Sequence, residues 1–307
     1  MKSRLRGILP PIPTIFDASG RIDRRAMSEN IRRWMTTDLS GVLALGSNGE
    51  AALLDEDESQ AVVETAREHV PRERLLLVGV GRESTRQTIS AAKRAAKAGA
   101  DAVLVRTPFF YKSQMTAEAL NAHFHAVADA APVPVVLYNL PGVTGVSFTL
   151  PIVTRLAEHP NVAGIKETSP DIERLGQFAG VRPDRFRVLC GCAPVVYPAL
   201  VSGASGAILA VANVLPDECC ALYAHVKAGR HHEALELQRK LTPLAQLVTT
   251  VHGVAGLKVA LELAGYHGGA VRAPLLTATS RIRDDIAAAY AAFGSEVRTG
   301  FVTGAQT

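Results

Sequence analysis

The chain of 307 residues has only four cysteines, no long apolar run and little excess charge. Its cysteines are Cys190, Cys192 and the adjacent pair Cys219-Cys220, so no CxxC pair is available for zinc binding or dithiol chemistry. No segment approaches the ~18 consecutive apolar residues of a membrane helix, so no membrane partner is expected. The net charge of +4 is mild and the arginines are scattered, which argues against nucleic acid as a partner.

Two further absences concern targeting and metal binding. The basic N-terminus has no uninterrupted apolar segment before its prolines, which argues against a signal peptide. Reduced cysteines used as small core residues are typical of a cytoplasmic protein, and we expect that location. The nine histidines are dispersed, and His123 and His125 stand two residues apart, on different faces of a predicted helix. We therefore expect neither a metal nor a cofactor.

Short apolar runs alternate with amphipathic stretches through most of the chain. Helical patterns separate the runs, and the one over residues 91–98 stops at Gly99, as a helix C-terminus should. Eight strand–helix units with nearly continuous apolar strands predict an α/β fold, a parallel (β/α)8 barrel. The rival is a doubly wound open sheet, but Gly79-Val80-Gly81 lacks the third glycine of a phosphate-binding fingerprint. The predicted strands are Ile8–Phe16, Gly41–Gly46, Leu75–Val80, Ala102–Arg106, Val133–Tyr138, Val162–Lys166, Arg187–Cys190 and Gly206–Val211.

The strand pattern stops at about residue 230. Three helical patterns follow, over residues 231–249, 254–264 and 280–293. We expect a catalytic barrel over residues 1–230 and C-terminal helices over residues 231–300, which either cap the barrel or make a subunit contact. The last residues, 301–307, are expected to be a mobile tail.

One lysine, Lys166, ends an apolar strand pattern that begins at Val162. A lysine in such a place is costly to keep charged, because desolvation favours the neutral amine. A neutral amine can condense with a ketone to form a Schiff base. The alternatives are a surface lysine on an edge strand or a lysine paired with Glu167, and this segment alone does not decide between them.

The ends of the predicted strands carry a chemically coherent set of side chains. In a parallel barrel, reactive groups stand at the C-terminal ends of the strands. Lys166 would be the nucleophile, Tyr138 could move a proton, and the turn at Ser47 offers donors for a carboxylate. The strand ends also carry Asn48, Arg106 and Gly191.

Each of these residues has a structural alternative. Tyr138 could be a core aromatic residue with a satisfied hydroxyl group. The turn around Ser47 and Asn48 could be an ordinary βα turn in which one of them caps a helix. Lys258 is a second lysine with apolar neighbours, but it lies in a helical pattern after the barrel, which favours a surface side chain that snorkels.

Three motifs resemble a known superfamily in sequence and order. They are Gly46-Ser47-Asn48-Gly49-Glu50, Tyr138-Asn139-Leu140-Pro141 and Gly164-Ile165-Lys166-Glu167. They are similar to those of the pyruvate-dependent class I aldolases, which include dihydrodipicolinate synthase and N-acetylneuraminate lyase. The resemblance implies a TIM barrel with C-terminal helices, usually a homotetramer. It further implies that Lys166 forms the Schiff base with a 2-oxo acid, that Tyr138 moves protons, and that Ser47 and Asn48 hold the carboxylate.

Two departures from the synthases concern the substrate. The synthases carry an arginine in the stretch that matches residues 141–145, where it binds an acidic aldehyde, and this chain has Val143 there. Valine cannot replace the charge-assisted hydrogen bonds of a guanidinium, so dihydrodipicolinate synthesis is disfavoured. The second tyrosine of the synthases aligns with Phe110, and Tyr111 is a candidate substitute.

The resemblance is greatest to 4-hydroxy-2-oxoglutarate aldolase. We expect a lyase that cleaves a 4-hydroxy-2-oxo acid to pyruvate and an aldehyde. The alternatives are an aldolase or dehydratase of 2-keto-3-deoxy sugar acids, an oxaloacetate decarboxylase, and a non-catalytic barrel that binds a 2-oxo acid. The far end of the pocket is expected around Val143, Gly191, Cys192 and Ile208. Arg106, which ends a predicted strand, is the candidate partner for a carboxylate at the far end of the substrate.

Overall fold

Eight parallel strands form the centre of the computed structural model, which describes residues 4–294. They are hydrogen-bonded in the order β1-β8-β7-β6-β5-β4-β3-β2. Backbone hydrogen bonds from Ser40 N–H to the Ile8 carbonyl and from Leu43 N–H to the Pro10 carbonyl join β2 to β1. The chain therefore forms the TIM barrel that the sequence predicts. The strands are β1 (Gly7–Leu9), β2 (Gly41–Ala44), β3 (Leu75–Gly79), β4 (Ala102–Arg106), β5 (Val135–Asn139), β6 (Val162–Glu167), β7 (Arg187–Cys190) and β8 (Gly206–Ile208).

The first and last strands are shorter than predicted. The run Ile8–Phe16 contributes only Ile8 and Leu9 to β1, because Pro10, Pro11 and Pro13 cannot donate to a sheet ladder. The run Gly206–Val211 leaves the sheet after Ile208 and turns into the 3-10 helix η6 (Ala210–Asn213). Both differences are at the ends of the predicted runs, and all eight predicted strands are present.

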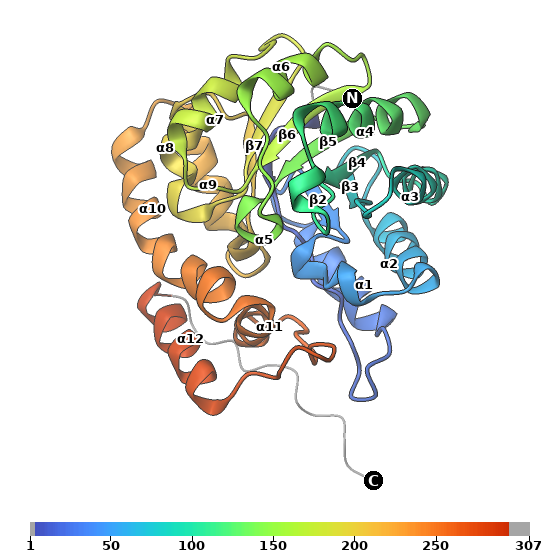
Figure 1. Cartoon of the computed structure of the whole chain (residues 1–307). Helices are drawn as coiled ribbons and strands as arrows, with labels where there is room; N and C mark the ends of the chain where they lie inside the picture. The colour runs from blue at the N-terminus through green and yellow to red at the C-terminus, as the bar shows by residue number, and fades with distance from the viewer. Residues whose placement is uncertain (1–3, 295–307) are drawn as a thin grey trace.

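Helices surround the barrel, as Figure 1 shows. Local signals in the sequence set their ends. The Thr116 hydroxyl accepts from the Ala119 N–H at the start of α4, and Gly99 after α3 adopts a φ of +101°. The helices of the barrel are α1 (Arg24–Trp34), α2 (Glu56–His69), α3 (Thr85–Lys97), α4 (Ala117–Ala130), α5 (Pro141–Thr144), α6 (Leu150–Ala157), α7 (Ile172–Ala179), α8 (Val196–Val201) and α9 (Pro216–Lys227).

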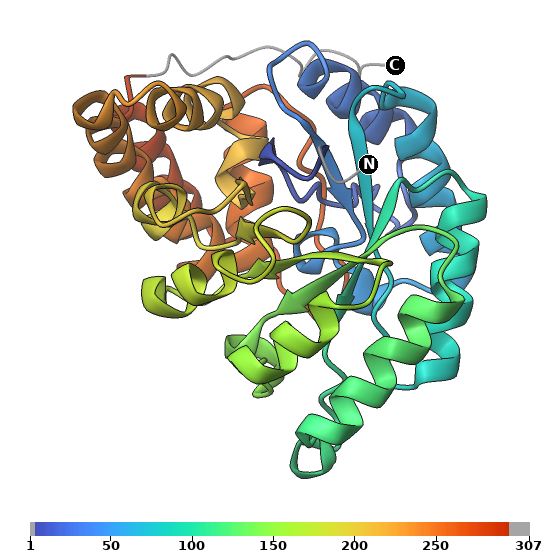
Figure 2. The same ribbon diagram turned by 90° about the horizontal axis from the view of Figure 1, so that it is seen from above.

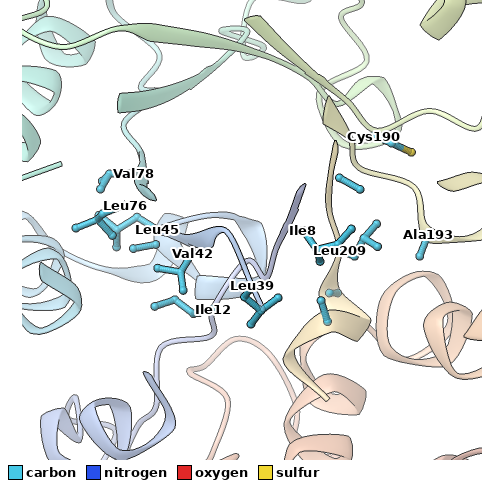
Figure 3. Packing of buried hydrophobic residues seen from close by; sticks show 14 of the residues in the cluster. Ile8, Ile12, Leu39, Val42, Leu45, Leu76, Val78, Cys190, Ala193 and Leu209 are labelled. Atoms are coloured by element: carbon cyan, nitrogen blue, oxygen red, sulfur yellow. The ribbon is translucent and has the colours of Figure 1, made fainter. Parts of the chain in front are cut away.

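The strands contribute to two apolar clusters. Residues that face into the barrel, such as Leu43, Leu77 and Leu104, form an inner cluster. Residues that face outward pack under the helices, and Figure 3 shows Val42 of β2 and Val78 of β3 among them. Burial on both faces explains why the strands read as continuous apolar runs rather than alternating ones.

Three helices follow the barrel: α10 (His231–Gln246), α11 (Gly253–Leu263) and α12 (Ser280–Ala292). A π-helical turn at Leu247–Val251 separates the first two, where the sequence predicts uninterrupted helix to residue 249. In Figure 2 these helices lie to one side of the barrel, opposite α3 and α4. The tail predicted over residues 301–307 lies outside the described residues. None of the helices within residues 4–294 has both the length and the apolarity needed to cross a bilayer.

Candidate active site

Lys166 and Tyr138 lie side by side on adjacent strands. Tyr138 of β5 and Lys166 of β6 are register partners in the parallel ladder. The Lys166 Nζ lies 3.3 Å from the Tyr138 hydroxyl oxygen and 4.3 Å from the centre of its ring. Both residues are buried, with 5% and 6% of their surface exposed. Within residues 4–294, no carboxylate forms an ion pair with Lys166.

A β-bulge on β6 directs Lys166 into the barrel. The pairing with β5 shifts by one residue, so that Val135 pairs with Val162 but Val136 pairs with Gly164. Ala163 therefore packs in the inner cluster and Ile165 in the outer one. With strict alternation Ile165 would point inward and Lys166 outward, because side chains alternate along a strand. At the bulge, a Cβ on Gly164 would lie 2.2 Å from the Arg187 carbonyl oxygen, so a larger residue does not fit there.

Glu167 does not pair with Lys166, and that alternative is wrong. Its carboxylate accepts hydrogen bonds from the Asn139 amide at 2.6 Å and from the Ser169 N–H at 2.7 Å. The Asn139 Oδ1 in turn accepts from the Phe148 N–H at 3.0 Å. Glu167 thus ties together the loops that follow β5 and β6, and Lys166 has the Tyr138 hydroxyl as its neighbour. An edge-strand position is also excluded, since β6 lies between β5 and β7.

Gly191 lies against the Lys166 side chain. A Cβ at this position would lie 2.9 Å from Lys166 Cε and 2.5 Å from Thr168 Oγ1. Any other residue would therefore displace the lysine. The Thr168 hydroxyl is buried and has no hydrogen-bond partner within residues 4–294, so it is a candidate substrate contact that the sequence did not predict. The only signal for it was its place two residues after Lys166.

Ser47 and Asn48 lie on the turn after β2, where they start the 3-10 helix η2 (Ser47–Gly49). Ser47 is exposed and Asn48 is half-buried. The alternative that one of them caps a helix is wrong, because Gly46 is the N-cap of η2 and Asp55 is the N-cap of α2. The Thr14 hydroxyl holds the turn from below by donating to the Gly49 carbonyl at 2.7 Å. Both side chains are thus free to meet a ligand at this end of the barrel.

The residues predicted for the far end of the pocket differ in exposure. Ile208 is buried and packs in the inner cluster with Tyr138. Val143 on α5 is 64% exposed, and the adjacent aromatic residues Phe110 and Tyr111 are 74% and 69% exposed. The rings of Phe110 and Tyr111 contact edge to face at 5.1 Å. No contact joins either aromatic residue to Lys166 or Tyr138 in the described chain.

Arg106 already has an anionic partner. Its guanidinium donates to Glu83 at 2.7 Å and lies over the Phe109 ring at 4.7 Å. Burial opposes ionisation of Glu83, but hydrogen bonds from the N–H groups of Phe110 and Phe109 and from Arg106 lower its pKa on balance. Arg106 therefore fixes the loop after β4, and its charge is compensated within the protein.

Lys258 is buried, so the prediction of a snorkelling surface side chain is wrong. It is 2% exposed, and its Nζ lies 2.7 Å from Oε1 of Glu50, the last residue of the Gly46–Glu50 turn. Its Nζ also donates to the Ala270 carbonyl. Burial lowers the pKa of Lys258, and the neighbouring Glu50 carboxylate opposes that shift.

Other reactive side chains do not compete with Lys166. Burial raises the pKa of the Cys190 thiol to about 12, so it is not a thiolate at neutral pH. His123 and His125 point to different partners, Thr85 and the Asn121 carbonyl, as their spacing predicts. Within residues 4–294 no three His, Cys, Asp or Glu side chains are grouped to bind a metal.

Comparisons with known proteins agree with this fold. The model of the dihydrodipicolinate synthetase family matches residues 4–292. A DapA-like lyase of Halobacterium salinarum is 36% identical over 271 residues, which cover 88% of each chain. A 4-hydroxy-tetrahydrodipicolinate synthase of Geotalea daltonii is 33% identical over 270 residues, 88% of this chain and 92% of that one.

Solved structures are similar over almost the whole chain. A monomeric dihydrodipicolinate synthase variant superposes with a TM-score of 0.90 at 30% identity, over 95% of this chain and 98% of that one. A prophage protein of E. coli K12 that belongs to the same family, solved in complex with pyruvate, gives a TM-score of 0.89 at 30% identity over 94% of this chain and 98% of that one. The chain belongs to the dihydrodipicolinate synthetase family and is a lyase of the class I aldolase type.

Proposed function

We propose that the protein cleaves a 4-hydroxy-2-oxo acid to pyruvate and an aldehyde through a Schiff base on Lys166. The observation that carries the proposal is the buried Lys166 amine, 3.3 Å from the Tyr138 hydroxyl and without a carboxylate partner in the described chain. An amine in this setting has no carboxylate to hold it and is a candidate nucleophile for a ketone. The prophage relative in complex with pyruvate supports a 2-oxo acid as the ligand.

The chemistry needs only groups at this site. The Lys166 amine attacks the C2 ketone, and Tyr138 gives its proton to the departing hydroxyl group, so that loss of water leaves a protonated imine and a phenolate. The Tyr138 phenolate then accepts the proton of the 4-hydroxyl group, the C3–C4 bond breaks, and the aldehyde leaves. The electron pair of the broken bond moves into the imine, which becomes an enamine. Protonation at C3 and hydrolysis of the resulting imine by water release pyruvate and restore the free amine.

The turn at Ser47 and Asn48 would bind the carboxylate next to the reacting ketone. Two exposed or half-exposed polar side chains and the amides of the 3-10 turn are the donors available there. Donors aimed at a carboxylate fix its position by charge-assisted hydrogen bonds. The adjacent ketone would then stand within reach of Lys166 for attack.

A second candidate substrate, a 2-keto-3-deoxy sugar acid, is favoured by the state of Arg106. A distal carboxylate, as in 4-hydroxy-2-oxoglutarate, needs a cation, but Arg106 is already paired with Glu83 at 2.7 Å. Val143 offers no charge where the synthases carry an arginine. A neutral polyol tail requires no counter-ion and would be accepted without desolvating an uncompensated charge.

Incubation with each substrate, followed by product analysis, tests the proposal. Release of pyruvate together with glyoxylate or a neutral sugar aldehyde supports cleavage and identifies the tail that is preferred. Loss of water or carbon dioxide without release of an aldehyde would show that the reaction on the imine is dehydration or decarboxylation and not cleavage. Stabilisation by pyruvate without turnover of any 2-oxo acid would indicate a binding protein instead. Lys166→Met serves as the inactive reference for each assay.

The proposal includes the assembly and the location of the protein. A homotetramer is supported by the exposed apolar side chains of Phe110, Tyr111 and Val143, which a neighbouring subunit could cover. The four cysteines are free and none is more than half-exposed, which fits a cytoplasmic enzyme. Sedimentation analysis of the purified protein measures the assembly directly.

A further inference from the structure

Backbone strain is concentrated at the two ends of the Ser47–Asn48 turn. Only three residues other than glycine have a positive φ in the described chain, and two of them are Leu45 at 55° and Glu50 at 52°. Such conformations are unfavourable for residues with a Cβ and persist only when surrounding contacts enforce them. The contacts of Glu50 show what enforces the conformation at the second end.

The Glu50 side chain contacts the C-terminal part of the chain. Its carboxylate has no exposed surface, and Oε1 lies 2.7 Å from the Lys258 Nζ on α11. Oε2 accepts from the Arg272 N–H at 2.8 Å. The Lys258 Nζ also lies over the Phe16 ring at 4.6 Å. One glutamate therefore connects the proposed carboxylate-binding turn to two separate C-terminal segments.

The segment that carries Arg272 is itself fixed to the barrel. The Arg272 guanidinium donates to both carboxylate oxygens of Glu58 at 2.6 and 2.7 Å and to the Gly20 carbonyl at 2.6 Å. It also lies 4.3 Å above the Phe16 ring. Glu50 accepts a hydrogen bond from the Arg272 main-chain N–H. A bidentate ion pair, which fixes the geometry of both partners, therefore holds that N–H in place.

We propose that Glu50, Lys258 and Arg272 are positioning residues, through which the C-terminal helices hold the Ser47–Asn48 turn in the strained conformation that binds the substrate carboxylate. Without the buried ion pair the turn would relax, and its donors would move away from the carboxylate. Lys166 lies on β6 beside Tyr138 and Gly191, and it would remain able to attack a ketone. This inference rests on the proposed carboxylate role of the turn.

A comparison of two ketones tests the proposal. Pyruvate has the carboxylate, and methyl pyruvate is its neutral ester, which keeps the ketone, so each variant is compared with wild type on the same ketone. Borohydride trapping at increasing concentrations gives the half-saturating concentration and the limiting rate for each. In Glu50→Gln/Lys258→Met, which removes both buried charges together, we expect about a tenfold rise in the half-saturating pyruvate concentration. Trapping of methyl pyruvate and the limiting rate with pyruvate should stay unchanged.

A second variant covers the case in which the double variant does not fold. Arg272→Met keeps the Glu50–Lys258 pair and removes the anchor of the main-chain donor, which should give a smaller rise of about threefold for pyruvate alone. The control is Glu262→Gln/Arg283→Met, which removes an exposed ion pair of 2.9 Å between α11 and α12. It should change the trapping of neither ketone.

The outcomes separate this inference from the proposed function. A selective loss for pyruvate supports positioning of the turn. Equal losses for both ketones show a general structural role and overturn the inference, as does unchanged pyruvate binding in both variants. Failure of the wild-type protein to trap pyruvate at Lys166 overturns the proposed function itself, and the inference with it.

Discussion

Lys166 and Lys258 are both buried and both lie over an aromatic ring, but their surroundings differ. Lys166 faces the Tyr138 ring at 4.3 Å, and Lys258 faces the Phe16 ring at 4.6 Å. Lys258 has the Glu50 carboxylate at 2.7 Å, whereas no carboxylate in the described chain pairs with Lys166. An apolar run precedes each lysine, so local sequence does not reveal this difference.

The difference shows how one fold gives two buried lysines two environments, on which their proposed roles rest. A buried ammonium group with a carboxylate at contact distance is held as a charged structural partner. A buried amine that has a hydroxyl group and no carboxylate beside it is not held by an ion pair, which is the basis for proposing it as the nucleophile. Burial alone therefore does not separate the proposed nucleophile from the structural lysine, and the partner of each lysine does.

The largest effect is expected from Lys166→Met. Removal of the nucleophile should lower kcat on every 2-oxo acid by about 10³-fold or more. The folded state should lose little stability, because no buried carboxylate is left unpaired. Steady-state turnover and urea unfolding measure both quantities, with the exposed Lys93→Met as the control. Turnover near wild type would contradict the role of Lys166.

Lys258→Met should show the opposite pattern, with its larger effect on the stability of the folded state. It leaves the Glu50 carboxylate buried without its partner, which should cost about 3–5 kcal/mol in the free energy of unfolding. Glu50→Gln/Lys258→Met should recover most of that loss, because it removes both charges. Urea unfolding of the single and double variants measures the coupling. If the single variant were as stable as wild type, the pair would not be a buried structural ion pair.

Tyr138→Phe tests the contribution of the hydroxyl group beside Lys166. The hydroxyl 3.3 Å from Lys166 is lost, while the ring remains. We expect kcat to fall by about 10²-fold, because a positioned proton-transfer group is removed. Borohydride should still trap pyruvate, since the amine is intact. Tyr223→Phe on α9 is the control, and an equal effect in both variants would argue against proton transfer by Tyr138.

The smallest effect is expected from loss of the ion pair between Arg272 and Glu58, and this effect depends on pH. Hydrogen bonding to Arg272 lowers the pKa of Glu58 below its usual value of 4.5. The pair therefore contributes stability that is fully present above pH 4.5 and is lost as the pH falls through the lowered pKa. Arg272→Met should cost about 1 kcal/mol near neutral pH. The difference from wild type should vanish in acid, and a difference independent of pH would contradict this account.

Much of the fold could be predicted from the sequence because its signals are local. Apolar runs bounded by turn residues predicted all eight strands, and Gly99 predicted a helix end that the structure contains. The errors have local causes too. Prolines shortened β1, and the π-helical turn at Leu247–Val251 interrupted a helical pattern that carried no breaker there.

The site was harder to predict where it depends on contacts between distant residues. Strand ends predicted Lys166 and Tyr138 as site residues, and the structure places them side by side, but the bulge at Ala163 and Gly164 that turns Lys166 inward appears only in the pairing of β5 with β6. The Glu50–Lys258 pair joins residues more than two hundred positions apart, and the pairing of Arg106 with Glu83 joins the end of β4 to the loop after β3. No local pattern encodes such partners, so Lys258 was assigned to the surface.

Borohydride reduction of the protein in the presence of pyruvate, followed by peptide mass mapping, tests the central claim most directly. We predict a reduced pyruvate adduct on Lys166 and none on Lys258, because only the first amine lacks a carboxylate partner in the described chain. No adduct on the folded protein, or an adduct on Lys258 instead, would contradict the assignment of Lys166 as the nucleophile.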